Sequence, residues 1–319
     1  MAIVAVAGGS GGIGRALVDA ITTRGKHKVK ILSRKTDDLL AEQTGVPVLV
    51  VNYTDVDGLT KVLEENNVGT VLSALFTLPV SGVPPEVGLI RAAQASKTTR
   101  RFVPSNWGLP LDESHQDIAP SVRMKLAATA ELSKSDLEHT VFYPGFLLDY
   151  YTGPSIKSYM SPLFVVIDME NNVAAIPGSG DTPVAFTHSL DMGRYVDATL
   201  DLERWDPSFR IVGDKITWNR FVAAAQDAKG TSFRIIHDSM EDLKKGEATV
   251  LPSVDKYLHL MSVPNKTVLS QFLATFGQLF DDGSFNIEEK GALNSMFPDI
   301  KPLTIHQALE AAAKSDSMY

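Results

Sequence analysis

The sequence has 319 residues and contains no cysteine. Disulfide bonds, zinc–thiolate sites and thiol nucleophiles are therefore excluded. No apolar run is long enough to span a bilayer, and the apolar residues 1–7 lack the basic flank of a secretory signal. We therefore expect a cytoplasmic protein with no membrane partner.

Positive charge is also scarce, because 30 Lys and Arg face 38 Asp and Glu. Nucleic-acid binding relies on clustered basic side chains, so we expect no nucleic-acid partner. The seven histidines show no metal-ligand spacing, and Gly178-Ser179-Gly180 lies in a predicted turn rather than at a strand–helix corner. We expect neither a metal site nor a serine hydrolase, and we expect His188 and Asp191 to pack and to cap a helix.

Up to about residue 145, short β-branched runs alternate with longer segments of helical period. This alternation is typical of a parallel sheet covered by helices on both faces, and it predicts an α/β, Rossmann-type doubly wound fold. The predicted strands are Ile3–Ala7, Val29–Leu32, Val46–Val51, Thr70–Ala74, Arg101–Pro104 and Thr140–Tyr143, and the predicted helices begin near Gly12, Asp55, Pro84 and Pro120.

A glycine-rich turn, Gly8-Gly9-Ser10-Gly11-Gly12-Ile13-Gly14, follows the first predicted strand and leads into an amphipathic helix. Glycine permits a tight turn and a close approach of the backbone to a pyrophosphate, and the helix N-terminus attracts the phosphates. In this setting the spacing of Gly9, Gly11 and Gly14 predicts dinucleotide binding, against the alternative of a merely tight corner.

The second predicted strand ends in Leu32-Ser33-Arg34-Lys35, where an NAD enzyme would place an acidic residue on the ribose hydroxyls. Arg34 can pair with a 2′-phosphate through two charge-assisted bonds, helped by Ser33 and Lys35. The strand end therefore predicts NADP(H) as the cofactor. The alternative is a solvated basic turn balanced by the two aspartates that follow.

From residue 146 onward the pattern changes to scattered strands, turns and several helices, including Leu190–Leu202 and Trp218–Ala228. We expect residues 1–145 to form the NADP-binding domain and residues 146–319 to form a smaller, interleaved and mainly substrate-binding part. Two segments of this part, Phe209–Val212 and Phe233–Ile236, are predicted to return to the sheet.

The fourth and fifth predicted strands end in Ser73-Ala74-Leu75-Phe76 and Ser105-Asn106-Trp107-Gly108, so both ends should open onto the cofactor crevice. With the glycine turn and the Leu-Ser-Arg strand end, the segment Phe102–Gly108 resembles the isoflavone reductase-like, or NmrA-like, group of atypical short-chain dehydrogenases. The segments Ala185–Tyr195 and Val212–Thr217 resemble further signatures of that group. The end of the chain carries no such resemblance.

The resemblance implies a lysine on the helix after the fifth strand that bonds the nicotinamide ribose and assists proton transfer. Lys125 occupies this place, seventeen residues after Gly108, and burial can lower the pKa of a lysine toward the working pH. Four residues before it stands Ser121 in place of the tyrosine of ordinary short-chain dehydrogenases, as the atypical group implies. A second catalytic candidate is His115, which either shuttles a proton or is an exposed loop histidine.

The expected ligand contacts come from the glycine turn and the strand ends. For the cofactor they are Gly8, Gly9, Ser10, Gly11, Gly12, Ile13, Gly14, Ser33, Arg34, Lys35, Ser73, Ala74, Leu75, Ser105, Asn106, Lys125, Tyr143, Pro144, Gly145 and Phe146. For the substrate they are Phe76, Trp107, Phe146, Leu147, Tyr150 and Tyr151. Such aromatic side chains suit an aromatic or polyketide-like substrate, although aromatic residues more often fill cores, so we expect about half to line the pocket.

These observations favour an NADPH-dependent reductase that transfers hydride to a small, aromatic molecule and acts as a monomer or homodimer. Two alternatives remain open at this point. Some NmrA-like proteins bind NADP without turnover and act as regulators, and a cyclase or isomerase on the same fold would have lost hydride transfer.

Overall fold

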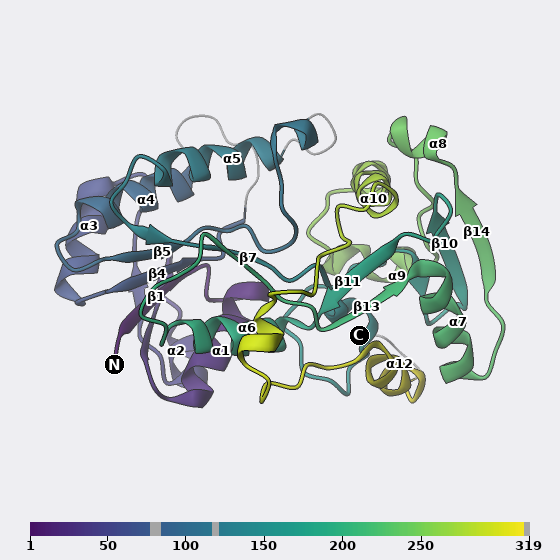
Figure 1. Ribbon diagram of the computed structural model, residues 1–319, viewed down its shortest axis with the longest axis horizontal. Helices are drawn as coiled ribbons and strands as arrows, with labels where there is room; N and C mark the ends of the chain where they lie inside the picture. The colour runs from purple at the N-terminus through teal and green to yellow at the C-terminus, as the bar shows by residue number, and fades with distance from the viewer. Residues whose placement is uncertain (77–83, 117–120, 316–319) are drawn as a thin grey trace. The chain divides into compact units, whose positions relative to one another are not determined.

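The computed structural model describes residues 1–76, 84–116 and 121–315, and the chain divides into two units (Figure 1). Unit 1 comprises Met1–Tyr143 and Met192–Phe209, whereas unit 2 comprises Pro144–Asp191 and Arg210–Tyr319. Each unit therefore contains two separate stretches of sequence. Within the described residues, no helix has both the length and the hydrophobicity required to cross a membrane.

Unit 1 is built on a six-stranded parallel sheet with the order β3-β2-β1-β4-β5-β6. The strands are β1 (Ile3–Ala7), β2 (Lys28–Ser33), β3 (Val48–Val50), β4 (Thr70–Ser73), β5 (Arg101–Val103) and β6 (Glu138–His139). The strand order reverses between β1 and β4, and ligands bind at such a switch point, beyond the carboxyl ends of the strands. The predicted α/β, doubly wound fold is confirmed.

Helices cover both faces of this sheet. They are α1 (Gly12–Arg24), α2 (Asp38–Thr44), α3 (Val56–Glu65), α4 (Pro85–Ala95), α5 (Ser121–Leu132) and α6 (Ser189–Thr199), with a short 3₁₀ turn, η1 (Glu113–His115). Figure 1 shows α3, α4 and α5 on one face and α1 and α6 on the other. Helix α6 packs closely on α1, because a Cβ atom at Gly193 would lie 2.9 Å from the carbonyl oxygen of Ala16.

The sixth strand of the sheet differs from the prediction. Strand β6 is formed by Glu138–His139, whereas most of the predicted strand Thr140–Tyr143 forms β7 (Val141–Tyr143), which pairs with β12 (Ser208–Arg210) in a separate two-stranded sheet. The buried side chains of Phe142 and Phe209 explain this pairing, because their ring centroids lie 5.5 Å apart.

Unit 2 contains two small sheets. One has the order β14-β10-β9, with β9 (Ile167–Asp168), β10 (Val173–Pro177) and β14 (Arg234–Asp238), and the other has the order β13-β11-β8, with β8 (Phe146–Leu147), β11 (Pro183–Thr187) and β13 (Asp214–Thr217). The predicted strand Phe233–Ile236 therefore does not return to the six-stranded sheet. It forms β14, which pairs in parallel with β10.

The helical elements of unit 2 surround an aromatic core. They are α7 (Trp218–Lys229), α8 (Met240–Lys244), α9 (Val254–Tyr257), α10 (Lys266–Asp281), α11 (Leu293–Met296) and α12 (Ile305–Ala313), with the 3₁₀ turns η2 (Leu148–Tyr151) and η3 (Leu258–Leu260). At the centre of the core, the ring of Phe146 lies 5.2 Å from that of Phe280 and 6.2 Å from that of Phe186.

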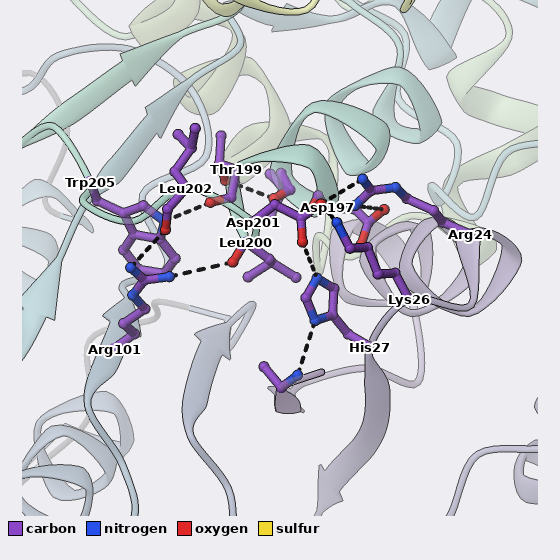
Figure 2. A network of polar contacts seen from close by, with 12 residues as sticks. Arg24, Lys26, His27, Arg101, Asp197, Thr199, Leu200, Asp201, Leu202 and Trp205 are labelled. Atoms are coloured by element: carbon purple, nitrogen blue, oxygen red, sulfur yellow. Dashed lines mark hydrogen bonds and ion pairs between the residues drawn. The ribbon is translucent and has the colours of Figure 1, made fainter.

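A charged network ties the end of α6 to α1 and the start of β2 (Figure 2). Asp197 is almost fully buried and lies 3.3 Å from Arg24, whereas Asp201 accepts hydrogen bonds of 2.6 Å from both Arg24 and Lys26. The Nε2 atom of His27 lies 3.2 Å from the same Asp201 carboxylate. The network therefore anchors residues far along the chain to the first helix of unit 1.

Arg101 of β5 adds a second anchor just beyond α6. Its guanidinium lies 4.8 Å from the ring centroid of Trp205 and donates hydrogen bonds to the carbonyl oxygens of Leu200 and Leu202 (Figure 2). The segment after α6 is thus fixed to β5, the neighbour of the edge strand β6 in the six-stranded sheet.

Candidate functional site

The glycine turn between β1 and α1 has a backbone that larger residues could not reproduce. Gly8 has a φ of 78°, and a Cβ atom there would lie 2.6 Å from the carbonyl oxygen of Ala74 at the end of β4. A Cβ atom at Gly14 would lie 2.1 Å from the carbonyl oxygen of Gly8. These close approaches bring the start of α1 against the ends of β1 and β4.

The same turn fits a pyrophosphate. Gly11 is the N-cap residue of α1, gives the helix no side-chain cap, and a Cβ atom there would point into open space. The first amides of a helix attract anions, and a turn without side chains lets a phosphate approach them. Ser10 and Gly11 are exposed, and Gly12 and Ile13 are half-buried, so the rim of the turn is accessible.

The end of β2 presents two basic side chains to solvent. Arg34 and Lys35 are exposed, and the backbone amide of Lys35 donates a hydrogen bond of 3.3 Å to the hydroxyl of Ser33. Asp37 caps α2 by accepting from the amide of Leu40. In the described part of the chain, neither basic side chain forms an ion pair.

The ends of β4 and β5 are tied to each other by hydrogen bonds. The indole of Trp107 donates to the carbonyl oxygen of Ser73 at 2.8 Å, and the hydroxyl of Ser105 donates to the carbonyl oxygen of Leu75 at 2.8 Å. The Oδ1 atom of Asn106 is buried without a hydrogen-bond partner among the described residues. Because unpartnered buried polar atoms are costly, this oxygen suits a ligand that donates a hydrogen bond.

Lys125 and Glu86 form the ionisable part of this neighbourhood. Lys125 is half-buried on α5, and burial lowers its pKa, while the negative charge of Glu86 acts in the opposite direction. Glu86 lies in the first turn of α4 with 4% of its surface exposed, and burial raises its pKa. Its carboxylate accepts a 2.6 Å hydrogen bond from the backbone amide of Ser105.

The second catalytic candidate, His115, lies in the turn η1. Its Nδ1 atom is 2.9 Å from the carboxylate of Asp112, which also accepts from the amide and hydroxyl of Ser114. This capping arrangement gives the imidazole a local structural role.

Two aromatic residues predicted to contact substrate lie at the strand ends of unit 1. The side chain of Phe76 is 73% exposed. Trp107 is buried, and its ring stacks on that of Phe142 with a centroid distance of 5.6 Å. The indole of Trp107 therefore links β4 and β7, and its contact with substrate stays a prediction.

The predicted residues after β7 belong to unit 2, and most of them are core residues. A Cβ atom at Gly145 would lie 2.2 Å from the carbonyl oxygen of Ala185, which explains the glycine by packing on β11. Phe146 and Leu147 are buried, and Tyr151 is 1% exposed with its hydroxyl donating to the carbonyl oxygen of Val165. Of the aromatic residues predicted here, Tyr150 retains a half-buried side chain. The strand positions Tyr143 and Pro144 are half-buried and buried respectively.

His188 packs as the sequence suggested, because it is 2% exposed and its Nδ1 atom accepts a 3.3 Å hydrogen bond from the backbone amide of Leu190 in the first turn of α6. Asp191, in the same turn, is 5% exposed. The start of α6 is held by Asp149, which accepts from both the amide and the hydroxyl of Ser189. Asp191 accepts from the backbone amide of Leu303 and so fixes a later segment of unit 2. Because Ser189 bonds Asp149 directly, these residues do not form the serine–histidine relay of a hydrolase. No group of three or more His, Asp or Glu side chains within the described ranges could hold a metal ion.

The sequence reasoning did not identify Glu86, because a glutamate in a first helical turn is usually exposed and gives no sign of burial. It also did not identify two phenylalanines on α10. Phe272 is 40% exposed, its ring lies 4.8 Å from that of Phe276, and Phe276 lies 5.3 Å from Phe146. The four-residue spacing of these phenylalanines is visible in the sequence and would have indicated one helix face.

The chain is similar to several known proteins. A family model described as NAD(P)H-binding matches residues 8–160. Oxidoreductase BOA1 of Botryotinia fuckeliana is 32% identical over 305 residues, which cover 95% of this chain and 96% of that protein. An isoflavone reductase-like protein of Olea europaea is 21% identical over 319 residues, with 96% and 97% covered. The solved structure of AtPrR2 with NADP+ and (+)-pinoresinol has a TM-score of 0.74 at 18% identity and covers 98% of both chains.

The relation to BOA1 extends over nearly the whole of both proteins, and the glycine turn lies at the start of the matched NAD(P)H-binding region. The cofactor and reaction class predicted from the sequence are thereby confirmed at the level of NAD(P)H-dependent redox chemistry. The chain belongs to the isoflavone reductase-like family of NAD(P)H-dependent oxidoreductases.

Proposed function

We propose that this protein is an NADPH-dependent reductase that transfers hydride to a conjugated or aromatic small molecule, with Lys125 assisting proton transfer. The observation that carries the proposal is the half-buried Lys125 with its acidic neighbour Glu86, close to the ends of β4 and β5. A half-buried lysine whose pKa is influenced by a buried acid has no evident value for a protein that only stores a dinucleotide.

NADPH is proposed over NADH because of the exposed basic turn after β2. Arg34 supplies a planar pair of donors for a 2′-phosphate, and Ser33 and Lys35 lie beside it. The glycine turn would hold the pyrophosphate on the first amides of α1. The residues at the ends of β4 and β5, Ser73 to Leu75 with Ser105 and Asn106, would face the nicotinamide half.

When bound, NADPH supplies the hydride that reduces an electrophilic carbon of the substrate. The ammonium of Lys125 holds a proton for the atom that gains negative charge. The unpartnered Oδ1 atom of Asn106 accepts a hydrogen bond and so orients an amide or hydroxyl donor. Lys125 thus acts as general acid, and the strand ends position the reacting groups.

An aromatic substrate class is supported by two observations. The exposed ring of Phe76 follows β4, and the half-buried Tyr150 lies beside Phe146 with a centroid distance of 5.7 Å. The related AtPrR2 has been solved with a phenolic ligand, (+)-pinoresinol. We therefore place flavonoids, lignans and polyketide-derived quinones first among the candidates.

The test is deuterium transfer. Purified protein is incubated with NADPH deuterated at C4 and with one of three acceptors in separate reactions. The acceptors are the lignan (+)-pinoresinol, a flavonoid and a naphthoquinone. Mass spectrometry should find deuterium in at least one reduced product, and Lys125→Met should diminish it. NADPH binding without transfer to any member of a broad acceptor panel would contradict the proposal and favour a regulatory role.

A further inference from the structure

Helices α4 and α5 lie side by side and are joined at the surface by an ion pair. Arg91 of α4 and Glu131 of α5 are 2.7 Å apart. Glu86 lies five residues before Arg91, and Lys125 lies six residues before Glu131. With a rise of about 1.5 Å per residue, Glu86 and Lys125 occupy matching levels, roughly 7–9 Å nearer the start of each helix.

The same helical geometry turns both side chains inward. Each residue rotates the side chain by about 100°, so five or six residues carry Glu86 and Lys125 away from the exposed surface pair. Burial agrees with this direction, because Glu86 is 4% exposed and Lys125 is half-buried. Both groups therefore lie on the inward side of their helices, and Glu86 contacts the backbone directly after β5.

A backbone hydrogen bond holds Glu86 in this position. Its carboxylate accepts the 2.6 Å hydrogen bond from the backbone amide of Ser105, directly after β5. Burial raises the pKa of Glu86, and the charge of Lys125 acts in the opposite direction. A buried carboxyl group with a fixed backbone donor has a defined geometry that a mobile surface acid lacks.

We propose that Glu86 is a positioning residue that pairs with Lys125 and keeps its amine protonated and directed toward the ends of β4 and β5. The interaction between Glu86 and Lys125 can exist in a protein without turnover. Its role in the reaction rests on the function proposed above. Glu86 would act through Lys125 and need not touch substrate.

The charges around the pair favour this role for Glu86. On the same helices, Arg91 pairs with Glu131 at the surface, and Arg123 is exposed. The turn η1, which also packs on α5, carries Glu113 and the Asp112–His115 pair. Among the described residues, Glu86 is the group whose charge raises the pKa of Lys125 against the lowering effect of burial.

The pairing is tested by measuring the pKa of Lys125 in the protein without cofactor or substrate. The protein is labelled with ¹³C-lysine, the Cε resonance of Lys125 is assigned by its loss in Lys125→Met, and its shift is followed against pH. Glu86→Gln keeps an oxygen for the Ser105 amide but removes the charge, so the pKa of Lys125 should fall by about one unit or more. Glu131→Gln removes a carboxylate from the same helix pair at the surface and should leave it unchanged. Equal shifts in the two variants would overturn the proposal.

A reciprocal measurement keeps the test decisive if Glu86→Gln does not fold. In ¹³C-glutamate-labelled protein, the pKa of the Glu86 carboxyl group should be higher in Lys125→Met than in the wild type. An unchanged value would also overturn the pairing. Once an acceptor that the protein reduces is known, turnover can be measured against pH. The pKa of Lys125 seen in this pH–rate profile should be lower in Glu86→Gln than in the wild type, and the KM for NADPH should be unchanged. An inactive protein that shows both NMR shifts would keep the pairing and reject the proposed function.

Discussion

The carboxylate of Asp197 lies 3.3 Å from the guanidinium of Arg24, yet burial raises the pKa of this acid to about 6. The folded protein thus holds a proton on Asp197 more tightly than the unfolded chain, in which the pKa of an aspartate is about 3.8. The contribution of Asp197 to stability is therefore full below about pH 4 and is lost as the pH rises through about 6.

Replacing Asp197 with Asn should remove this loss. A pKa shift of this size corresponds to at most about 3 kcal/mol of unfolding free energy. As the pH rises from about 4 to 7, the wild type should therefore lose up to this amount of stability relative to the variant. Burial lowers the pKa of His27, so its contribution to stability increases as the pH rises, and His27 is present in both proteins. Urea unfolding at several pH values measures the difference. Asp136→Asn, at an exposed site, is the control, and parallel stability curves for wild type and Asp197→Asn would refute the prediction.

Two glycines of the same turn should respond differently to alanine. In Gly14→Ala the new methyl group would meet the carbonyl oxygen of Gly8 at 2.1 Å, whereas in Gly11→Ala it would enter open space. We expect Gly14→Ala to lose about 2 kcal/mol or more of stability and most of its NADPH affinity, and Gly11→Ala to lose less than about 1 kcal/mol of stability. Thermal unfolding and NADPH titration distinguish the two, and equal stability losses would be inconsistent with the close packing of Gly14.

Arg34→Ala should weaken NADPH binding by about 1.5–3 kcal/mol, because it removes a charge-assisted pair with the 2′-phosphate. Binding of NADH, which lacks that phosphate, should be nearly unaffected. Isothermal titration with both dinucleotides measures the change, and Lys28→Ala, an exposed basic residue at the other end of β2, is the control. Equal affinities of the wild type for the two dinucleotides would reject the assignment.

Lys125→Met should retain the fold and most of the NADPH affinity while lowering turnover by roughly 10²–10⁴, the range for a lost acid–base group. His115→Ala should cost less, because that imidazole is engaged with Asp112 in a local cap. The measurement is NADPH oxidation with the acceptor identified by deuterium transfer. Arg123→Met, an exposed cation two residues away on α5, is the matched control, and undiminished turnover in Lys125→Met would remove the residue from the mechanism.

The sequence predicted those parts of the protein that depend on local pattern. The glycine turn, the basic strand end and the strand–helix alternation are contiguous signals, and β1 is found at its predicted residues Ile3–Ala7. The partners of Val141–Tyr143 and Arg234–Asp238 were not predictable in this way, because short strands of similar composition pair according to tertiary packing. Glu86 escaped detection for a related reason, since its burial depends on α5 and the end of β5.

The aromatic residues illustrate the same limit of local pattern. Phe146 and Tyr151 follow a strand end, as pocket residues do, but their neighbours in unit 2 are contributed by segments far along the chain. Phe280 and Phe221 close the space around them, which makes them core residues. The spacing of residues along the chain predicts which side chains share a face. Whether that face contacts a ligand or packs in the core depends on segments far away in the sequence.

The division of unit 1 into two stretches governs the order in which the protein can be completed during synthesis. Its second stretch, Met192–Phe209, provides Asp197, Trp205 and most of β12, the partner strand of β7. A nascent chain that has emerged only as far as Tyr143 therefore leaves the hydrogen bonds of β7 and the charges of Arg24 without their partners until residues beyond 200 have left the ribosome. Unit 1 therefore cannot complete its fold until Pro144–Asp191, the first stretch of unit 2, has been synthesised.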